Sequence, residues 1–360
     1  MTDTGSEQQR WRMLFIFGTV TVLLLCAFLF VHIFQFAHVF QLFLIMFGAT
    51  LVGVCFQGLT AWVSERTGLP WFPTLSGVLL LLVGAVGAFA VLAGPQIVEQ
   101  IITLIDRIPA DLAKLEETIA RYEWGQALLE RLPPADEMVP PRTQILGSLS
   151  GIFSTALDSF TSVVIVLVVG MYLAVSPDLY REGILHLVPR EHRERAGEVM
   201  QMLGRALRWW LVGRFTSMAV VGVMTMAGLW LIGVPLPLAL GFIAGGLAFV
   251  PYFGPILSAV PAVLIGLGQS PLAGLYVLLV YSGIQLLEGY VITPQIQQRA
   301  VSLPPALLLT AQFFMGFMFG FIGLLLATPL TVSVIVLIQA LYVQGVLGDD
   351  VEVLGEHRGW

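Results

Sequence analysis

Charged residues are scarce in this chain. Only 11% of its 360 residues are Asp, Glu, Lys or Arg, and 57% are hydrophobic, whereas a soluble domain carries about 25% charged residues. Each of four charge-free runs is close to or longer than the roughly 20 residues that a spanning helix needs. They are 13–64, 67–98, 159–177 and 215–287. The composition excludes an ordinary soluble domain and predicts an all-α polytopic membrane protein.

Cysteine, basic clusters and catalytic motifs are also nearly absent. Cys26 and Cys55 lie in apolar runs, where a free Cys behaves as a small hydrophobic residue. The net charge of -6 and the scattered arginines argue against nucleic acid as a partner. The sequence has no H-E-x-x-H motif and no P-loop. We therefore expect no enzyme activity, no catalytic residue, no metal, no cofactor and no ATP hydrolysis within this chain.

About eight hydrophobic helical elements are predicted. Two long apolar blocks, 238–268 and 305–343, contain internal Pro and Gly and are predicted to be broken or re-entrant. Six ordinary spans complete the set: 13–31, 40–63, 75–98, 152–176, 209–232 and 272–293. Arg10 and Arg12 precede the first span and Arg66 follows the second, so the positive-inside rule predicts a cytoplasmic N-terminus. Full crossings or hairpins at the two blocks both return the C-terminus to the same side.

The first polar region carries an apolar stripe that repeats every three or four residues, which predicts a helix continuing from the third span. Its members are Ile97, Ile101, Leu104, Ile108, Leu112, Leu115, Ile119 and Tyr122. The stripe fits packing against its own neighbours or a coiled-coil-like contact between protomers. The second alternative predicts a homo-oligomer.

The C-terminal half contains a weak internal repeat. The segment "VPLPLAL" at 234–240 matches "VSLPPAL" at 301–307 at five of seven positions, and "LSAVP" at 257–261 matches "LLATP" at 325–329 at three of five. If both blocks are membrane hairpins, the repeat has inverted topology, as in many secondary transporters. Gly241 and Gly245 form a small-x-x-x-small pattern that favours close helix packing.

The stretch "FVPYFGP" at 249–255 interrupts the first block. A helix broken inside a bilayer leaves backbone groups unpaired, which is tolerated only inside protein or beside a water-filled cavity. The residues Pro251, Tyr252, Gly254, Pro255 and Ser258 are therefore candidates for lining a polar path. A proline kink whose gaps are filled by neighbouring helices is the alternative.

Glu288 is the other candidate, in "IQLLEGYVITPQI" at 284–296. A carboxylate within a span costs several kcal/mol and is a functional candidate by default, as a proton carrier, cation ligand or substrate partner. It lies toward the end of its helix, so a snorkelling or structural role is the alternative. Gln285, Gly289 and Pro294 belong to the same candidate segment.

These motifs, in this order, resemble the autoinducer-2 exporter-like permease family of bacteria. They are "IGVPLPLALGFIAGGLAFVPYFGP", "IQLLEGYVITPQI", "VSLPPALLL" and "GFIGLLLATPL". The resemblance implies a multi-pass protein of the bacterial inner membrane, usually drawn with eight spans. Some relatives are linked to export of autoinducer-2 and others to exchange of sodium for protons. It supports Pro251, Tyr252, Gly254, Pro255, Glu288, Gly289 and Pro294 as site residues.

These observations divide the chain into six segments. Both termini and the arginine-rich segment 178–208 are predicted to be cytoplasmic. The segments are 1–98 with the N-terminal membrane helices, 99–150 outside the cytoplasm, 151–177 with one membrane helix, 178–208 as an amphipathic segment, 209–345 as a transport core, and 346–360 as a tail.

Three functions remain open from the sequence. The first is a secondary transporter of a small polar solute, with export of an autoinducer-2-like signal as the leading hypothesis. The second is a sodium and proton antiporter that uses Glu288. The third is an oligomeric membrane scaffold or passive channel. The expected partners are a small polar solute or ion, the lipid bilayer and further copies of the chain.

The position of Arg299 generates a topology prediction. Hairpins at both blocks place the 294–304 loop inside, as the positive-inside rule favours for a loop with an arginine. A Gln298→Cys variant should therefore react with an impermeant thiol reagent from the cytoplasmic side. Reaction from the outside alone would contradict the hairpins and restore eight full crossings.

Overall fold

The structure is a computed structural model. It describes residues 39–121, 126, 163–292, 304–349 and 353–354, and every regular element of this part is helical. The all-α polytopic fold predicted from the sequence is confirmed. The predicted span at 13–31, Pro294 and the Arg299 loop lie outside the described residues.

By length and composition, five helices of the described part can cross a membrane. A sixth is added if Val163–Val175 and α7 (Pro177–His186), bent by 88°, form one broken span. The five are Val39–Thr67, α2 (Trp71–Leu92), Arg190–Leu231, Pro271–Val291 and Pro305–Leu347. The third contains α8 (Arg193–Leu231), the fourth contains α11 (Pro271–Leu287), and the fifth contains α13 (Pro305–Leu337) and the π-helical segment η3 (Ile338–Leu347).

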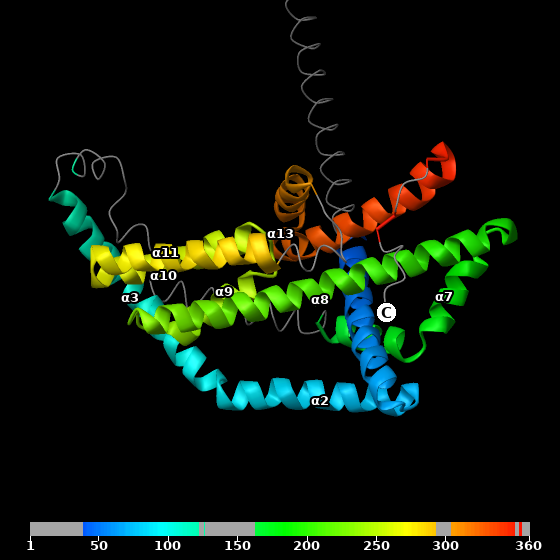
Figure 1. The fold of residues 1–360 in the computed structure, drawn as a ribbon, viewed down its shortest axis with the longest axis horizontal. Coiled ribbons are helices and arrows are strands. Elements are labelled where there is room, and N and C mark those ends of the chain that lie inside the picture. The colour runs from blue at the N-terminus through cyan, green and yellow to red at the C-terminus, as the bar shows by residue number, and fades with distance from the viewer. Residues whose placement is uncertain (1–38, 122–125, 127–162, 293–303, 350–352, 355–360) are drawn as a thin grey trace, which may run out of the picture.

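α8 is a long helix that runs across the middle of the molecule (Figure 1). Its 39 residues correspond to about 58 Å at 1.5 Å per residue. Its C-terminal half packs against α9 (Pro237–Leu247), and its N-terminal half packs against the second half of α13. The sequence predicted a boundary after residue 208, but α8 runs through it without a break. The amphipathic segment and the span are one helix, because no proline interrupts them.

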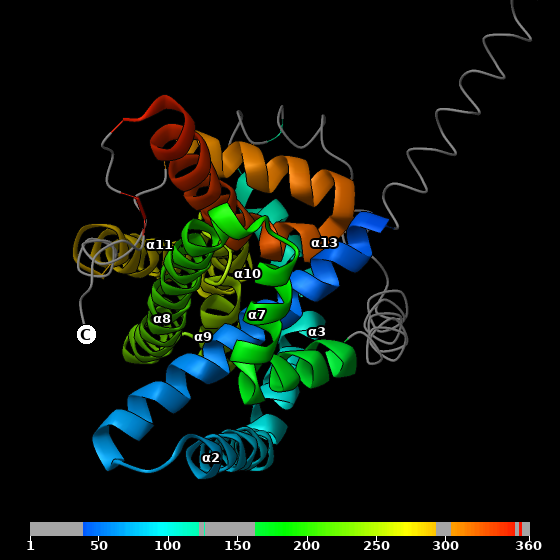
Figure 2. The same cartoon turned by 90° about the vertical axis from the view of Figure 1, so that its right-hand side faces the viewer.

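Different helices lie on the two sides of α8. In both views α13 lies on one side and α2 on the other, with the helix Val39–Thr67 running between them (Figures 1 and 2). The side chains of α2 are widely exposed, with Leu80 at 79% and Leu81 at 73%. Such an apolar surface suits contact with lipid tails or another protein chain.

The contact between α8 and α9 depends on glycine. Gly222 of α8 faces Gly241 and Gly245 of α9, so the two backbones approach closely. A Cβ added at Gly245 would lie 2.8 Å from the carbonyl oxygen of Met218 and 3.0 Å from the Cα of Gly222. The small-x-x-x-small pattern therefore serves helix packing.

α9 and α10 (Phe253–Gln269) form a helical hairpin. Near the open end, Gln269 Nε2 donates to the carbonyl of Gly233, at 3.3 Å. At the closed end, Gly254 packs on the backbone of Leu247. The 11 residues of α9 span about 16 Å, which is about half of a hydrocarbon core about 30 Å thick. The first broken block is therefore observed, with its break at 248–252.

The second broken block folds at Gly320, where α13 has φ 63° and ψ -146°. Beyond this bend the helix packs on its own first half, since a Cβ at Gly316 would lie 3.6 Å from the Cβ of Leu324. A shift of 68 residues aligns "LSAVP" with "LLATP" (257 + 68 = 325). The same shift aligns Tyr252 with Gly320, and both have a positive φ. The two copies of the repeat thus break at corresponding positions.

α3 (Gly94–Ala120) follows α2 after Ala93 and docks on the hairpin. Gln100 Oε1 accepts a hydrogen bond from Ala239 N of α9, at 3.0 Å. Leu104 is buried in the core formed with α9, α10 and α11, and Ile108 packs against that core. For these two stripe residues, packing within the chain is the alternative that the structure supports. Self-association through the remaining stripe stays a prediction.

Adjacent glycines of α9 provide a matched test of the packing. Gly245→Ala should destabilise the protein by about 1 to 3 kcal/mol, because its methyl group meets backbone. Gly246→Ala is the control: a Cβ there meets nothing within 4 Å, so it should be neutral or stabilising by up to about 1 kcal/mol. Thermal unfolding in detergent measures both. Equal stability of the two variants would contradict the close contact of α8 and α9.

Candidate functional site

The closed end of the α9–α10 hairpin is a tight, strained turn. Tyr252 has φ 65° and ψ -49°, and Phe253 N donates to the carbonyl of Pro251 at 2.8 Å. This is a γ-turn of the rare positive-φ kind. Gly254 follows it against the carbonyl of Leu247, where any Cβ would overlap backbone. Backbone strain of this kind is found preferentially at functional sites.

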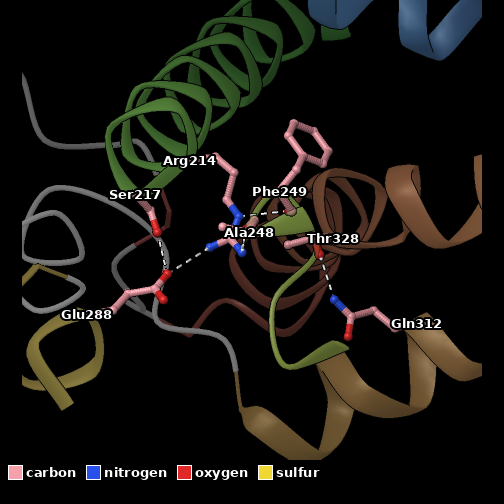
Figure 3. Close-up of polar contacts among 7 residues, drawn as sticks. All are labelled: Arg214, Ser217, Ala248, Phe249, Glu288, Gln312 and Thr328. Atoms are coloured by element: carbon pink, nitrogen blue, oxygen red, sulfur yellow. Dashed lines mark hydrogen bonds and ion pairs between the residues drawn. The ribbon is translucent and has the colours of Figure 1, made fainter. Parts of the chain in front are cut away.

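Arg214 of α8 reaches into this break (Figure 3). Its Nε donates to the carbonyl of Phe249 at 2.8 Å, and its Nη2 donates to the carbonyl of Ala248. Ala248 is the residue that ends α9, so the guanidinium satisfies carbonyls at a helix C-terminus. A cation is favourable there because the helix dipole is negative at that end.

Glu288 completes the cluster from α11. Arg214 Nη1 lies 3.9 Å from Glu288 Oε1, and the hydroxyl of Ser217 donates to the same oxygen. The side chains of Arg214 and Glu288 are only 14% and 12% exposed. Glu288 also begins the π-helical turn η2 (Glu288–Ile292), a local form of helix that occurs frequently at functional sites. Three helices thus meet at one buried ion pair.

The backbone at the break is largely paired, which corrects the expectation that a helix broken there leaves backbone groups unpaired. The nitrogen atoms of Val250 and Gly254 donate to Leu247 and Val250, at 3.0 Å each. Arg214 donates hydrogen bonds to two further carbonyls, those of Phe249 and Ala248. The physical reason is that one guanidinium carries several donors in a fixed fork. Polar chemistry at the break is therefore carried by side chains.

The structure brings part of the predicted site together. Gly254 and Ser258 are buried, Pro251 and Pro255 are half-buried, and Tyr252 is 42% exposed. The hydroxyl of Ser258 donates to the carbonyl of Pro255 at 3.1 Å. The hydroxyl of Tyr281 on α11 donates to the carbonyl of Ser258, also at 3.1 Å, and so ties α10 to α11.

The remaining predicted residues lie at the end of α11. Glu288 belongs to the cluster with Arg214, and Gln285 is half-buried one turn earlier. Gly289 is exposed. Pro294 falls outside the described residues. Within this segment, Glu288 is the residue that contacts Arg214 and so connects the end of α11 to the break.

Sequence reasoning missed Arg214 and Ser217. Arg214 lies in the predicted span 209–232, directly before the charge-free run 215–287, and was not named as a candidate. One signal was available: residues three apart on a helix lie on the same face, so Arg214 and Ser217 form a polar pair at the edge of an apolar span. A second polar pair was also missed: Gln312 Nε2 donates to the hydroxyl of Thr328, at 3.2 Å.

Among the residues that the structure describes, no three His, Cys, Asp or Glu side chains gather as a metal site requires. The chemistry that the break offers is hydrogen bonding, ion pairing and proton exchange at one carboxylate. Broken helices and buried charged side chains among membrane spans are features typical of membrane transporters. Residues 19–343 match the AI-2E family transporter, and the chain belongs to this family.

Two relatives of known sequence align with most of the chain at low identity, and a third aligns with about a third of it. "Putative transport protein YrrI" of Bacillus subtilis is 26% identical over 282 residues, 76% of this chain and 78% of its own length. "Putative permease PerM" of Escherichia coli is 26% identical over 274 residues, 73% of this chain and 77% of its own. "AI-2 transport protein TqsA" of Escherichia coli is 28% identical over 126 residues, 35% and 37% of the two chains.

The Arg214 cluster generates a stability prediction. Arg214→Met should cost about 3 kcal/mol, because it leaves Glu288 charged and unpaired. The double variant with Glu288→Gln should be more stable than the sum of the two single losses by about 1 kcal/mol. A double-mutant cycle on detergent unfolding measures this coupling. Arg121→Met, at an exposed pair with Glu117, is the control and should change stability by at most about 1 kcal/mol. Additive losses would contradict the pair.

Proposed function

We propose that this AI-2E family transporter is a secondary exporter of a small polar solute, with autoinducer-2 or a close analogue as the substrate. The observation that carries the proposal is the buried Arg214–Glu288 pair at the hairpin break. Burying a charged pair among apolar spans costs free energy, so such a pair is by default a candidate for contact with a solute or ion that crosses the membrane.

The solute path is proposed to run past the break, beside Tyr252 and Gly254 and toward Glu288. Three observations support it. The turn at Tyr252 is strained, the contact at Gly254 leaves no room for a side chain, and Arg214 and Ser217 hold the carboxylate in place. A neutral, hydroxyl-bearing solute can exchange hydrogen bonds with such a preorganised cluster without bringing a charge into the bilayer.

The substrate class is supported by relatives. The transport protein TqsA is named for AI-2, and it aligns with this chain over 126 residues at 28% identity. The longer matches, to YrrI and PerM, carry only transport or permease names. Export of an autoinducer-2-like solute is thus the specific part of the proposal, and membrane transport is the part that family membership supplies.

Location and assembly belong to the same proposal. The bacterial permease relatives support the inner membrane. The arginines between 181 and 208 support a cytoplasmic side for the N-terminal end of α8, with both chain termini on that side. The widely exposed α2 and the remaining stripe of α3 support a homo-oligomer.

A sodium and proton antiporter is the second candidate, because Glu288 is a buried carboxylate at the break. Arg214 argues against a sodium ion resident on it, since the cation would lie close to a guanidinium that is 3.9 Å from the same oxygen. Protonation of Glu288 would instead loosen the pair. The two candidates therefore differ in what Glu288→Gln does to ion flux.

Reconstituted flux tests the two functions. Proteoliposomes should carry autoinducer-2, and Glu288→Gln should slow this flux about tenfold or more, because the ion pair at the break is lost. Glu198→Gln, at an exposed pair with Arg195, is the control and should leave flux unchanged. Sodium-dependent proton flux that disappears in Glu288→Gln, with no autoinducer-2 flux in the unaltered protein, would replace the exporter by the antiporter.

A further inference from the structure

Gln312 is an unusual residue for its position in α13. It is fully buried, at 0% exposure, within the apolar first half of the helix. Its Nε2 donates to the hydroxyl of Thr328 at 3.2 Å, across the bend at Gly320. Its Oε1 is also buried and has no hydrogen-bond partner among the described residues. One end of the amide is thus fixed and the other is free.

A buried amide end without a partner is destabilising by the desolvation of that group. Other polar side chains of the same helix are satisfied internally: Thr331 and Ser333 donate to the carbonyls of Ala327 and Pro329, at 2.7 and 2.9 Å. The free end of Gln312 is therefore an exception within α13.

The location of Gln312 connects it with the α9–α10 break. Trp210 of α8 contacts Phe249 of the break edge to face, with ring centroids 5.6 Å apart. Trp210 also packs against the core that contains Leu326 and Ala327, the residues directly before Thr328. Trp210 thus links the first break to the core that the second half of α13 helps to form. Figure 3 shows Gln312 and Thr328 together with the Arg214 cluster at the first break.

Two other buried hydroxyls of the described part lack partners, Thr60 and Thr225. Both lie inside unbroken helices, Val39–Thr67 and α8. Gln312 differs because its amide joins the two halves of a folded helix. An amide that is already oriented by Thr328 loses little further freedom when it accepts a new hydrogen bond.

We infer that Gln312 is a solute-binding residue that accepts a hydrogen bond from a hydroxyl of a neutral solute, with Thr328 holding the amide in position. The inference rests on the proposed transport function and adds a contact from the second copy of the repeat. The first break is contacted by a charged cluster from α8 and α11, and the second break holds a neutral amide. A solute with several hydroxyl groups fits between such contacts, because one of its O–H groups can donate to Gln312 Oε1.

Thiol accessibility tests whether Gln312 faces the path. Gln312→Cys is introduced into a Cys26→Ala/Cys55→Ala background, with Val332→Cys as the control, because Val332 has 0% exposure in the second half of the same helix. A small cationic methanethiosulfonate reagent should modify position 312 in proteoliposomes, and autoinducer-2 should slow the reaction. Position 332 should stay unmodified. No reaction at 312, or equal reaction at both positions, overturns the inference.

Flux and stability separate a binding role from a structural one. Gln312→Leu should raise the KM for autoinducer-2 about 2- to 12-fold, as the loss of one hydrogen bond does, while its melting temperature is kept or raised because an unpaired polar group is gone. Thr331→Val, whose hydroxyl is satisfied within α13, should leave the KM unchanged. An unchanged KM in Gln312→Leu overturns the inference. If the unaltered protein moves no autoinducer-2, the proposed function fails, and accessibility at position 312 still decides on the path.

Discussion

The hydrogen bonds of Arg214 at the end of α9 are the interaction on which the C-terminal half of the molecule depends. One guanidinium satisfies the carbonyls of Ala248 and Phe249 and neutralises Glu288. Without it, a helix end and a carboxylate would both be buried with unmet polar groups, each costly in a low-dielectric interior. The break, the end of α11 and the middle of α8 are therefore stable only together.

The two copies of the internal repeat are stabilised at their breaks by different interactions. Tyr252 and Gly320 correspond in the repeat and both have a positive φ, yet the first break is held by an ion pair and the second by Gln312 and Thr328. The first break uses a strained non-glycine turn, while the second uses glycine, which adopts positive φ without strain. The duplicated architecture thus surrounds an asymmetric, partly charged and partly neutral region.

Much of the fold is predictable from the sequence, because long charge-free runs and internal Pro and Gly are local signals. They located the break at "FVPYFGP" and the second broken block. Arg214 was not predictable in the same way: its role depends on the carbonyls of a helix that follows it by some thirty residues, which no local pattern reports. The expectation of unpaired backbone groups at the break was wrong for the same reason, because a distant side chain, Arg214, pairs with two of these carbonyls.

α8 also determines how movements can be shared. It is a single continuous helix that contacts α9 along its C-terminal half and α13 along its N-terminal half. An α-helix of this length is stiff along its axis, because every turn is tied to the next by hydrogen bonds. A displacement of one end of α8 is therefore transmitted to its other end. In the proposed transport function, a solute that shifts α9 would thus also displace the helices packed on the other end of α8, which would link access from the two sides of the bilayer.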